Sequence, residues 1–293
     1  MSKEHTMRRI IVKVGTSCLT YPNGKLNIGG IERLVRVIAD LQNRGYQMVL
    51  VSSGSVGVGV AKLGWTERPK DIRHKQAAAA VGQCELMHIY DKIFLEYGVK
   101  SAQILLTRDN TTNEEQRANI HGTFDILLDT GVVPIVNEND TVATAELEYM
   151  ETFGDNDTLS AVVAQVCAAD LLVIFTDIDG LYDSNPRKDP HAHLIDRVEE
   201  IDATLWAAAG GPGSANGTGG MTTKLSAAQL CMDAGISMLI TKGQAEILYD
   251  IVDGKPVGTL FKRPRKSSQA FGPFAKSSMT TYKTHKENES CEI

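Results

Sequence analysis

The stretch Arg8–Ser17, "RRIIVKVGTS", passes directly from apolar residues into a turn of small residues. Its apolar residues do not alternate with polar ones, which is typical of a β-strand covered on both faces. Lys13 interrupts this run, and Gly15 follows it. The same pattern, a short apolar run bounded by polar or small residues, recurs five times: Tyr46–Ser52, Ala102–Thr107, Val132–Asn137, Leu171–Thr176 and Ser237–Thr241.

Helical patterns lie between these runs. The segment Asn27–Gly45 carries apolar residues at helical spacing, and Gly45 is a typical residue just beyond a helix end. Thr112, with Glu115 three residues later, predicts a capping box that begins a second helix, which ends near Gly131. A third helix is predicted to end at Gly235. Alternation of strands and helices predicts an α/β fold, a three-layer sandwich with a central, mainly parallel sheet.

Composition limits the classes of function. The chain has 293 residues, 42% of them hydrophobic and 23% charged, and a net charge of −6, which argues against nucleic acid or an anionic membrane as a partner. The five cysteines are scattered, so we expect no disulfide framework and no structural metal site. Without an apolar run long enough to span a bilayer, a cytoplasmic location is predicted. Residues 1–263 are expected to form one domain, and 264–293 a disordered polar tail that includes part of the basic cluster Lys262–Lys266.

Polar or Gly-rich loops follow most of the predicted strands, and ligands of such folds bind at the carboxyl ends of the strands. Each loop also has a purely structural interpretation. Lys13 could belong to an edge strand or extend its ammonium group to solvent. Asn156 and Asp157 are residue types that cap helices. The run Gly210–Gly220 could be a flexible linker. Taken together, these structural interpretations are weaker than each is alone. All the loops should lie at the same edge of the sheet, where a ligand would bind.

The segment Gly210–Leu230 suggests a phosphate site that is not a P-loop. Three residues separate Gly220 from Lys224, and Leu225 stands where the P-loop has Ser or Thr. The sequence also lacks the Gly-x-Gly-x-x-Gly pattern of dinucleotide-dependent oxidoreductases after its first strand, which weakens that alternative.

Six motifs, in this order, resemble those of the glutamate 5-kinases in the amino acid kinase family, over roughly Arg8–Lys262. They are "VKVGTS" (Val12–Ser17), "VSSGSVGVG" (Val51–Gly59), "PIVNENDTVAT" (Pro134–Thr144), "GDNDTLSA" (Gly154–Ala161), "TDIDGLYDSNPR" (Thr176–Arg187) and "GTGGMTTKLSAA" (Gly217–Ala228). The resemblance implies transfer of the γ-phosphoryl group of ATP to the side-chain carboxylate of L-glutamate, the first step toward proline. A sibling kinase acting on acetylglutamate, aspartate, carbamate or UMP is the alternative, and a non-catalytic subunit would be expected to lack the two lysines or Asp157.

The resemblance also implies roles for individual residues. Lys13 and Lys224 would act on the transferred phosphoryl group, and Asp157 would organise the two lysines. Ser53, Asp140 and Asn156 would bind glutamate, with Asn137 in support. The nucleotide would contact Lys13, Gly15, Gly54, Thr176, Asp177, Thr218, Gly219, Gly220, Met221, Thr222, Thr223 and Lys224.

The implied cofactor is Mg²⁺, entering with ATP and held mainly by phosphate oxygens, and no protein residue is predicted as its ligand. Implied partners are proline as a feedback inhibitor, glutamate-5-semialdehyde dehydrogenase as recipient of the labile product, and further copies of this chain in a homo-oligomer. Two departures from many bacterial relatives are expected: a longer loop around Glu146–Phe153 beside the glutamate pocket, and no C-terminal RNA-binding-like PUA domain.

Overall fold

The computed structural model describes residues 8–21, 24–142, 156–184, 186, 189–209 and 220–262. The expected long loop at Glu146–Phe153 and the expected tail at 264–293 lie outside these residues. The described strands are β1 (Arg9–Val14), β2 (Gln47–Ser52), β3 (Lys100–Leu106), β4 (Val132–Glu138), β5 (Leu171–Thr176), β6 (Arg197–Val198), β7 (Ser237–Lys242) and β8 (Thr259–Phe261). The described α-helices are α1 (Thr16–Leu19), α2 (Ile28–Asn43), α3 (Ser55–Lys62), α4 (Ile72–Glu96), α5 (Arg108–Thr112), α6 (Glu114–Asp129), α7 (Asn156–Val166), α8 (Ala203–Ala208), α9 (Met221–Asp233) and α10 (Ile247–Val252), and η1 (Asp140–Val142) is a 3₁₀ helix.

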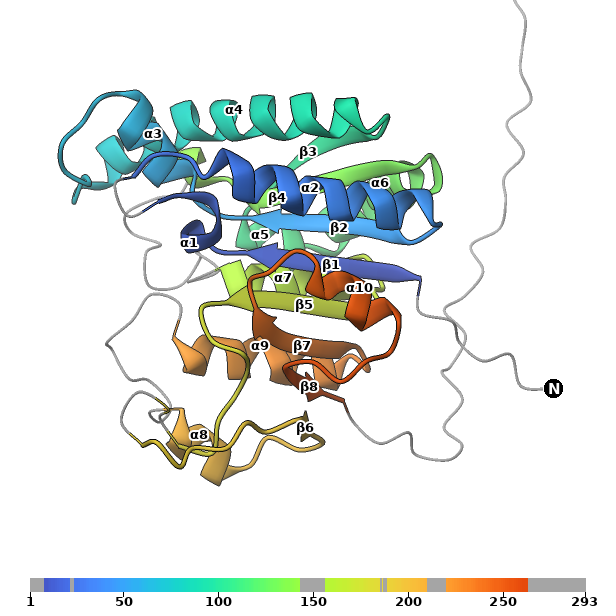
Figure 1. The fold of residues 1–293 in the computed structure, drawn as a ribbon. Helices are drawn as coiled ribbons and strands as arrows, with labels where there is room; N and C mark the ends of the chain where they lie inside the picture. The colour runs from blue at the N-terminus through green and yellow to red at the C-terminus, as the bar shows by residue number, and fades with distance from the viewer. Residues whose placement is uncertain are drawn as a thin grey trace, which may run out of the picture. The chain divides into compact units, whose positions relative to one another are not determined.

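The strands form one sheet in the order β3-β4-β2-β1-β5-β7-β8-β6 (Figure 1). Neighbouring strands are parallel except for β7 and β8, which pair antiparallel. The predicted mainly parallel sheet is therefore confirmed, and each of the six predicted strands is present to within two residues of its expected start. The short strands β6 and β8 were not predicted, because two or three residues are too few to show a periodic pattern.

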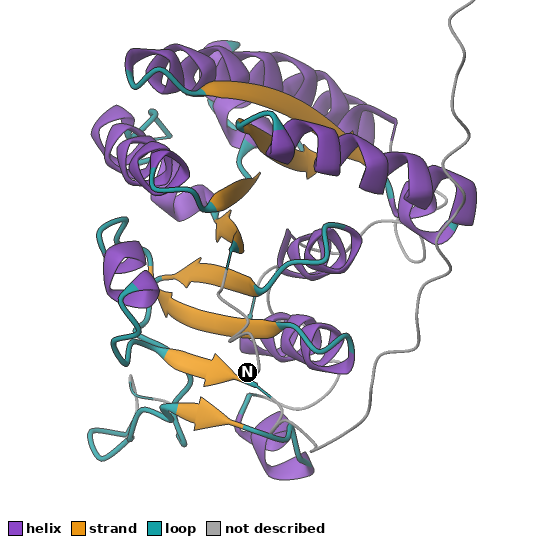
Figure 2. Ribbon diagram, turned by 90° about the vertical axis from the view of Figure 1, so that its right-hand side faces the viewer, coloured by secondary structure: helices purple, strands orange, loops and turns teal. Residues whose placement is uncertain are grey.

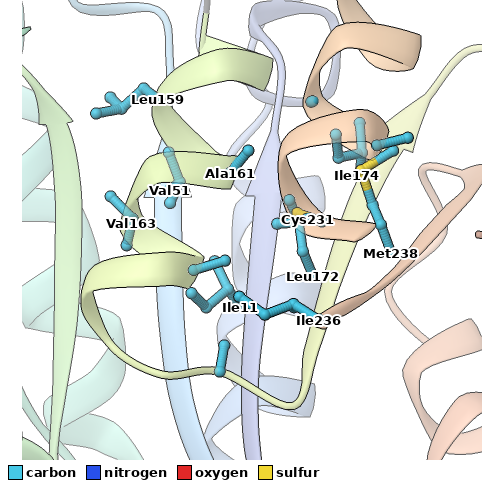
Figure 3. Close-up of a cluster of buried hydrophobic side chains, with 14 of the residues drawn as sticks. Ile11, Val51, Leu159, Ala161, Val163, Leu172, Ile174, Cys231, Ile236 and Met238 are labelled. Carbon is cyan, nitrogen blue, oxygen red and sulfur yellow. The ribbon is translucent and has the colours of Figure 1, made fainter. Parts of the chain in front are cut away.

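Helices cover both faces of the sheet, and the strands twist from one edge of the sheet to the other (Figure 2). On one face, α6, α7 and α9 pack over alternate residues of the central strands, including Ile11 and Val51. Figure 3 shows this core, in which Leu159, Ala161 and Val163 of α7 lie close to the central strands. On the other face, α2, α4 and α10 pack over the remaining residues, such as Ile10 and Val12. Burial of both faces explains why the inner strands, such as β2 and β5, are continuous apolar runs in the sequence.

The start of α6 differs from the prediction. Thr112 is the last residue of α5, and the helix cap is Asn113, whose side chain accepts a hydrogen bond from the backbone N–H of Gln116. Asn and Thr both cap helices, and Glu115 would have completed the capping box with Thr112, so the sequence pattern favoured the wrong residue by one position.

The long helix α4 was not predicted from the sequence, and its contact with α3 depends on two glycines. A Cβ on Gly59 would lie 1.8 Å from the backbone oxygen of Ala78, and a Cβ on Gly82 would lie 1.8 Å from that of Ser55. Only glycine, which has no Cβ, allows the backbones of α3 and α4 to approach so closely. Because α3 begins immediately after β2, this contact fixes the loop at the carboxyl end of that strand.

Among the described residues, none of the helices has the length and apolar character needed to cross a bilayer.

We expect Gly59→Ala to lower the free energy of unfolding by roughly 1–3 kcal/mol, because the added methyl group meets backbone that cannot rotate away. Urea unfolding followed by circular dichroism measures the change. Gly122→Ala is the matched control, since Gly122 is also helical and an added Cβ there meets nothing within 4 Å. The control should be stabilised by up to about 1 kcal/mol. Equal stability of the two variants would contradict the role of the α3–α4 contact.

Candidate active site

Lys13 lies on an inner strand of the sheet. Its strand, β1, has β2 on one side and β5 on the other, so the interpretation of Lys13 as an edge residue is wrong. The residue is only 8% exposed and lies on the face covered by α7 and α9. A buried lysine of this kind needs a partner for its charge.

Asp157 supplies that partner and binds a second lysine as well. Its side chain, in the first turn of α7, is fully buried. One carboxylate oxygen, Oδ1, lies 2.6 Å from the Nζ of Lys13, and the other, Oδ2, lies 3.1 Å from the Nζ of Lys224 on α9. Both lysine side chains are at most 10% exposed. Asp157 is therefore not simply a helix cap: one carboxylate joins β1, α7 and α9.

The two lysines keep Asp157 in its charged form. Burial alone would raise the pKa of Asp157, but the Lys13 and Lys224 ammonium groups outweigh it and hold the pKa below the usual value of 3.8. The carboxylate is therefore ionised at neutral pH. Two ammonium groups fixed close to each other favour an anion as a ligand.

Thr223 has a contact that the sequence did not indicate. Its hydroxyl lies 3.0 Å from Oδ2 of Asp157 and 2.7 Å from the backbone oxygen of Gly220. The residue belongs to the predicted nucleotide loop, but its hydroxyl also contacts the carboxylate that binds both lysines. Spacing alone could have placed Thr223 beside Lys224, whereas the contact with Asp157 required the three-dimensional arrangement.

The predicted nucleotide residues are described in part. Gly54 precedes α3 with φ of +95°, a conformation that favours glycine, so the turn after β2 depends on this residue. Gly15 has an ordinary φ, and a Cβ there would lie 3.9 Å from the Nζ of Lys13. Thr176, at the end of β5, donates a hydrogen bond to Asp177. Gly220, Met221 and Thr222 begin α9 with Thr223 and Lys224, while Thr218 and Gly219 lie outside the described residues.

The predicted glutamate residues form two groups at the carboxyl ends of β2 and β4. In the first group, the amide nitrogen of Asn156 lies 2.5 Å from the hydroxyl of Ser53 and 3.4 Å from the amide oxygen of Asn137. In the second group, the hydroxyl of Ser55 donates a 2.7 Å hydrogen bond to Asp140. Burial raises the pKa of Asp140, and the Ser55 hydrogen bond opposes this in part. A cation beside Asp140 would favour its ionised form.

Three polar residues of the site were missed from the sequence. Ser55 contacts Asp140, Gln83 of α4 accepts a hydrogen bond from Asn137, and Tyr90 of α4 lies 3.0 Å from Ser52, hydroxyl to hydroxyl. The spacing of Gln83 and Tyr90, two helical turns, could have placed them on one face. The signal was hidden because α4 itself was not predicted.

The sequence of this chain is similar to those of known kinases. Residues 8–242 match the family model described as the amino acid kinase family. The chain belongs to the amino acid kinase family. It is 52% identical over 255 residues to a protein named Glutamate 5-kinase from Clostridium perfringens, which covers 87% of this chain and 95% of that protein. It is also 52% identical over 255 residues to one of the same name from Listeria innocua, covering 87% of this chain and 92% of that protein.

Solved structures show the same fold at low sequence identity. A structure of isopentenyl phosphate kinase has a TM-score of 0.59 at 17% identity, covering 86% of this chain and 99% of that chain. A product complex of T. acidophilum isopentenyl phosphate kinase has a TM-score of 0.57 at 16% identity, covering 87% of this chain and 99% of that chain. The family and fold predicted from the sequence are confirmed.

We expect Asp157→Asn to lower the free energy of unfolding by about 3–5 kcal/mol at pH 7, because two buried ammonium groups would lose their shared counterion. Since the pKa of Asp157 is lowered in the folded state, its stabilising contribution is complete above the usual value of 3.8 and is lost as the pH falls below it. The difference from wild type should therefore be constant between pH 7 and about pH 5 and should shrink near pH 3.5.

Urea unfolding curves across this pH range test the expectation. Asp253→Asn, at an exposed carboxylate, is the control and should change stability little at any pH. A difference for Asp157→Asn that grows as the pH falls would contradict the assigned ion pairs.

Proposed function

We propose that this chain transfers the γ-phosphoryl group of ATP to the side-chain carboxylate of L-glutamate, forming L-glutamyl 5-phosphate for proline biosynthesis. The observation that carries the proposal is the buried Asp157 carboxylate between the ammonium groups of Lys13 and Lys224. Family membership and the named relatives support the choice of reaction and substrate.

The reaction needs little from an enzyme beyond positioning and charge. A carboxylate is already ionised at neutral pH, so the nucleophile requires no general base. The difficulty is that an anionic nucleophile must approach an anionic phosphate, and that negative charge must be stabilised on the oxygens of the transferred group. Fixed cations in a site that excludes water do both.

Lys13 and Lys224 suit this task because they belong to different elements. Lys13 extends from the central strand β1, and Lys224 lies in the first turns of α9, so the phosphoryl group can be bound between them. Asp157 prevents the two ammonium groups from moving apart under their mutual repulsion. The backbone N–H groups of Gly15 and Gly54 and the residues Thr218–Lys224 would contact the phosphates, and Thr176 and Asp177 would contact the rest of the nucleotide.

The glutamate would bind at the ends of β2 and β4. Asp140 would accept hydrogen bonds from the α-ammonium group, and its raised pKa would fall on binding this cation. Ser53 and Asn156 would contact the substrate carboxylates. The hydrogen bonds that link Ser53, Asn156 and Asn137 restrict these side chains before the substrate arrives.

Mg²⁺ is proposed to enter as part of the nucleotide substrate. Asp157, the buried carboxylate nearest the proposed phosphoryl site, is already bound by two ammonium groups, and such a carboxylate is a poor additional metal ligand. When bound, Mg²⁺ would neutralise phosphate charge.

Inhibition by proline, transfer of the product to glutamate-5-semialdehyde dehydrogenase and assembly into a homo-oligomer stay predictions.

We expect Lys13→Ala and Lys224→Ala each to lower kcat by at least about a hundredfold, because each removes a charge that stabilises the transition state. Formation of glutamyl hydroxamate from ATP, glutamate and hydroxylamine measures the rate, with aspartate, acetylglutamate and UMP as alternative acceptors. Lys255→Ala, at an exposed lysine on the loop before β8, is the control and should retain wild-type turnover. Near-normal kcat in a folded Lys13 or Lys224 variant would exclude the proposed role.

Asp140→Asn should raise KM for glutamate roughly ten- to a hundredfold, since a hydrogen bond between charged groups is lost while the side chain keeps its size. KM for ATP should stay within about twofold, because Asp140 is assigned to the α-ammonium group of glutamate and not to the nucleotide. Steady-state kinetics with each substrate varied in turn distinguish the two constants. The assignment would be wrong if KM for ATP rose and KM for glutamate did not.

A further inference from the structure

A chain of side-chain amides connects helix α4 to the proposed glutamate site. The amide nitrogen of Asn137 donates a 3.0 Å hydrogen bond to Oε1 of Gln83. The amide oxygen of Asn137 lies 3.4 Å from the amide nitrogen of Asn156, which in turn lies 2.5 Å from the hydroxyl of Ser53. One side chain, that of Asn137, therefore lies between Gln83 and Asn156, and Ser53 follows Asn156 in the chain.

The hydrogen bonds around Asn137 fix which way its side-chain amide lies. A carboxamide has a donor on one side and an acceptor on the other, so its orientation decides what it offers to each neighbour. With the Gln83 oxygen accepting, Asn137 presents its own oxygen to Asn156 and to the backbone N–H of Glu138, which donates a 2.9 Å hydrogen bond. If Asn137 were reversed, its NH₂ group would face two donors. Asn137 is only 3% exposed, so water could not readily compensate for this mismatch.

Helix α4 gives Gln83 a fixed position. The preceding residue, Gly82, is in backbone contact with Ser55 and Gly59 of α3. Two turns further along α4, the buried hydroxyl of Tyr90 pairs with that of Ser52 at the end of β2. The backbone oxygen of Ser52 also lies 3.3 Å from the amide nitrogen of Asn156. The same helix therefore restrains the ends of both β2 and β4.

We propose that Gln83 is a positioning residue for the glutamate site: by holding the amide of Asn137, it sets the orientation of Asn156 and Ser53 toward the substrate. It touches none of the reacting atoms. This inference rests on the proposed function. It differs from a purely structural role, which would alter stability and the binding of both substrates rather than of glutamate alone.

The test is a double-mutant cycle between Gln83→Met and Asn137→Ala. Gln83→Met keeps the length of the side chain and removes the acceptor. We expect it to raise KM for glutamate about three- to tenfold while kcat and KM for ATP change by less than about twofold. In the Asn137→Ala background, the same substitution should change KM for glutamate by less than about twofold, because the amide that it holds is already gone. Cys84→Met, at the adjacent exposed position of α4, is the matched control and should match wild type.

The outcomes separate this inference from the function on which it rests. Wild-type hydroxamate formation with glutamate tests the function by itself, and its absence would overturn both. With that activity present, an unchanged KM in Gln83→Met would overturn the role of Gln83 alone. An equal fold-change in KM with and without Asn137 would do the same, since it would indicate a general loosening of α4. Gln83→Leu provides a second variant without the acceptor, in case Gln83→Met fails to fold.

Discussion

A single buried carboxylate, that of Asp157, determines how the candidate active site is assembled. Burying an ion is costly unless its charge is compensated, and Asp157 is compensated twice, by Lys13 and by Lys224. These three residues come from β1, α7 and α9, so their ion pairs join the central strand of the sheet to two helices on one face. The folded chain therefore brings two like charges together, which would be unfavourable without the carboxylate between them. In our proposal, the two ammonium groups held by this carboxylate bind the anionic phosphoryl group.

The other half of the site depends on close packing rather than on charge. Gly59 and Gly82 allow α3 and α4 to touch through their backbones, and α4 then supplies Gln83 and Tyr90 to the ends of β4 and β2. In our proposal, the phosphoryl group would be bound by the ion-paired lysines and the glutamate by the hydrogen-bonded amides. The two parts meet at adjacent residues of α7, because Asn156 belongs to the amide chain and Asp157 to the lysine pair.

The sequence predicted the parts of the molecule that follow simple patterns. Most of the six main strands are apolar runs because both faces of the sheet are covered, and the carboxyl ends of the strands indicated where to look for a site. Helix α4 was not predicted because its first half is rich in small residues, Ala77–Ala80 and Gly82, next to polar ones. It therefore lacks the stripe of large apolar residues that indicates a helix in a sequence. Lys13, Asp157 and Lys224 were named through a family resemblance. Their mutual contacts, and those of Thr223, Ser55 and Gln83, depend on residues far apart in the sequence, which no local pattern reveals.

The central claim is that Lys13 and Lys224, held by Asp157, bind the phosphoryl group during transfer. A crystal structure of the protein with MgADP, aluminium fluoride and glutamate would test it most directly, because the fluoride complex imitates the transferred group. We predict that the fluoride ligands lie within hydrogen-bonding distance of both ammonium groups, with Asp157 still bound to both lysines. Aluminium fluoride bound in the site away from either lysine, or Asp157 turned from the lysines to the metal, would contradict the account.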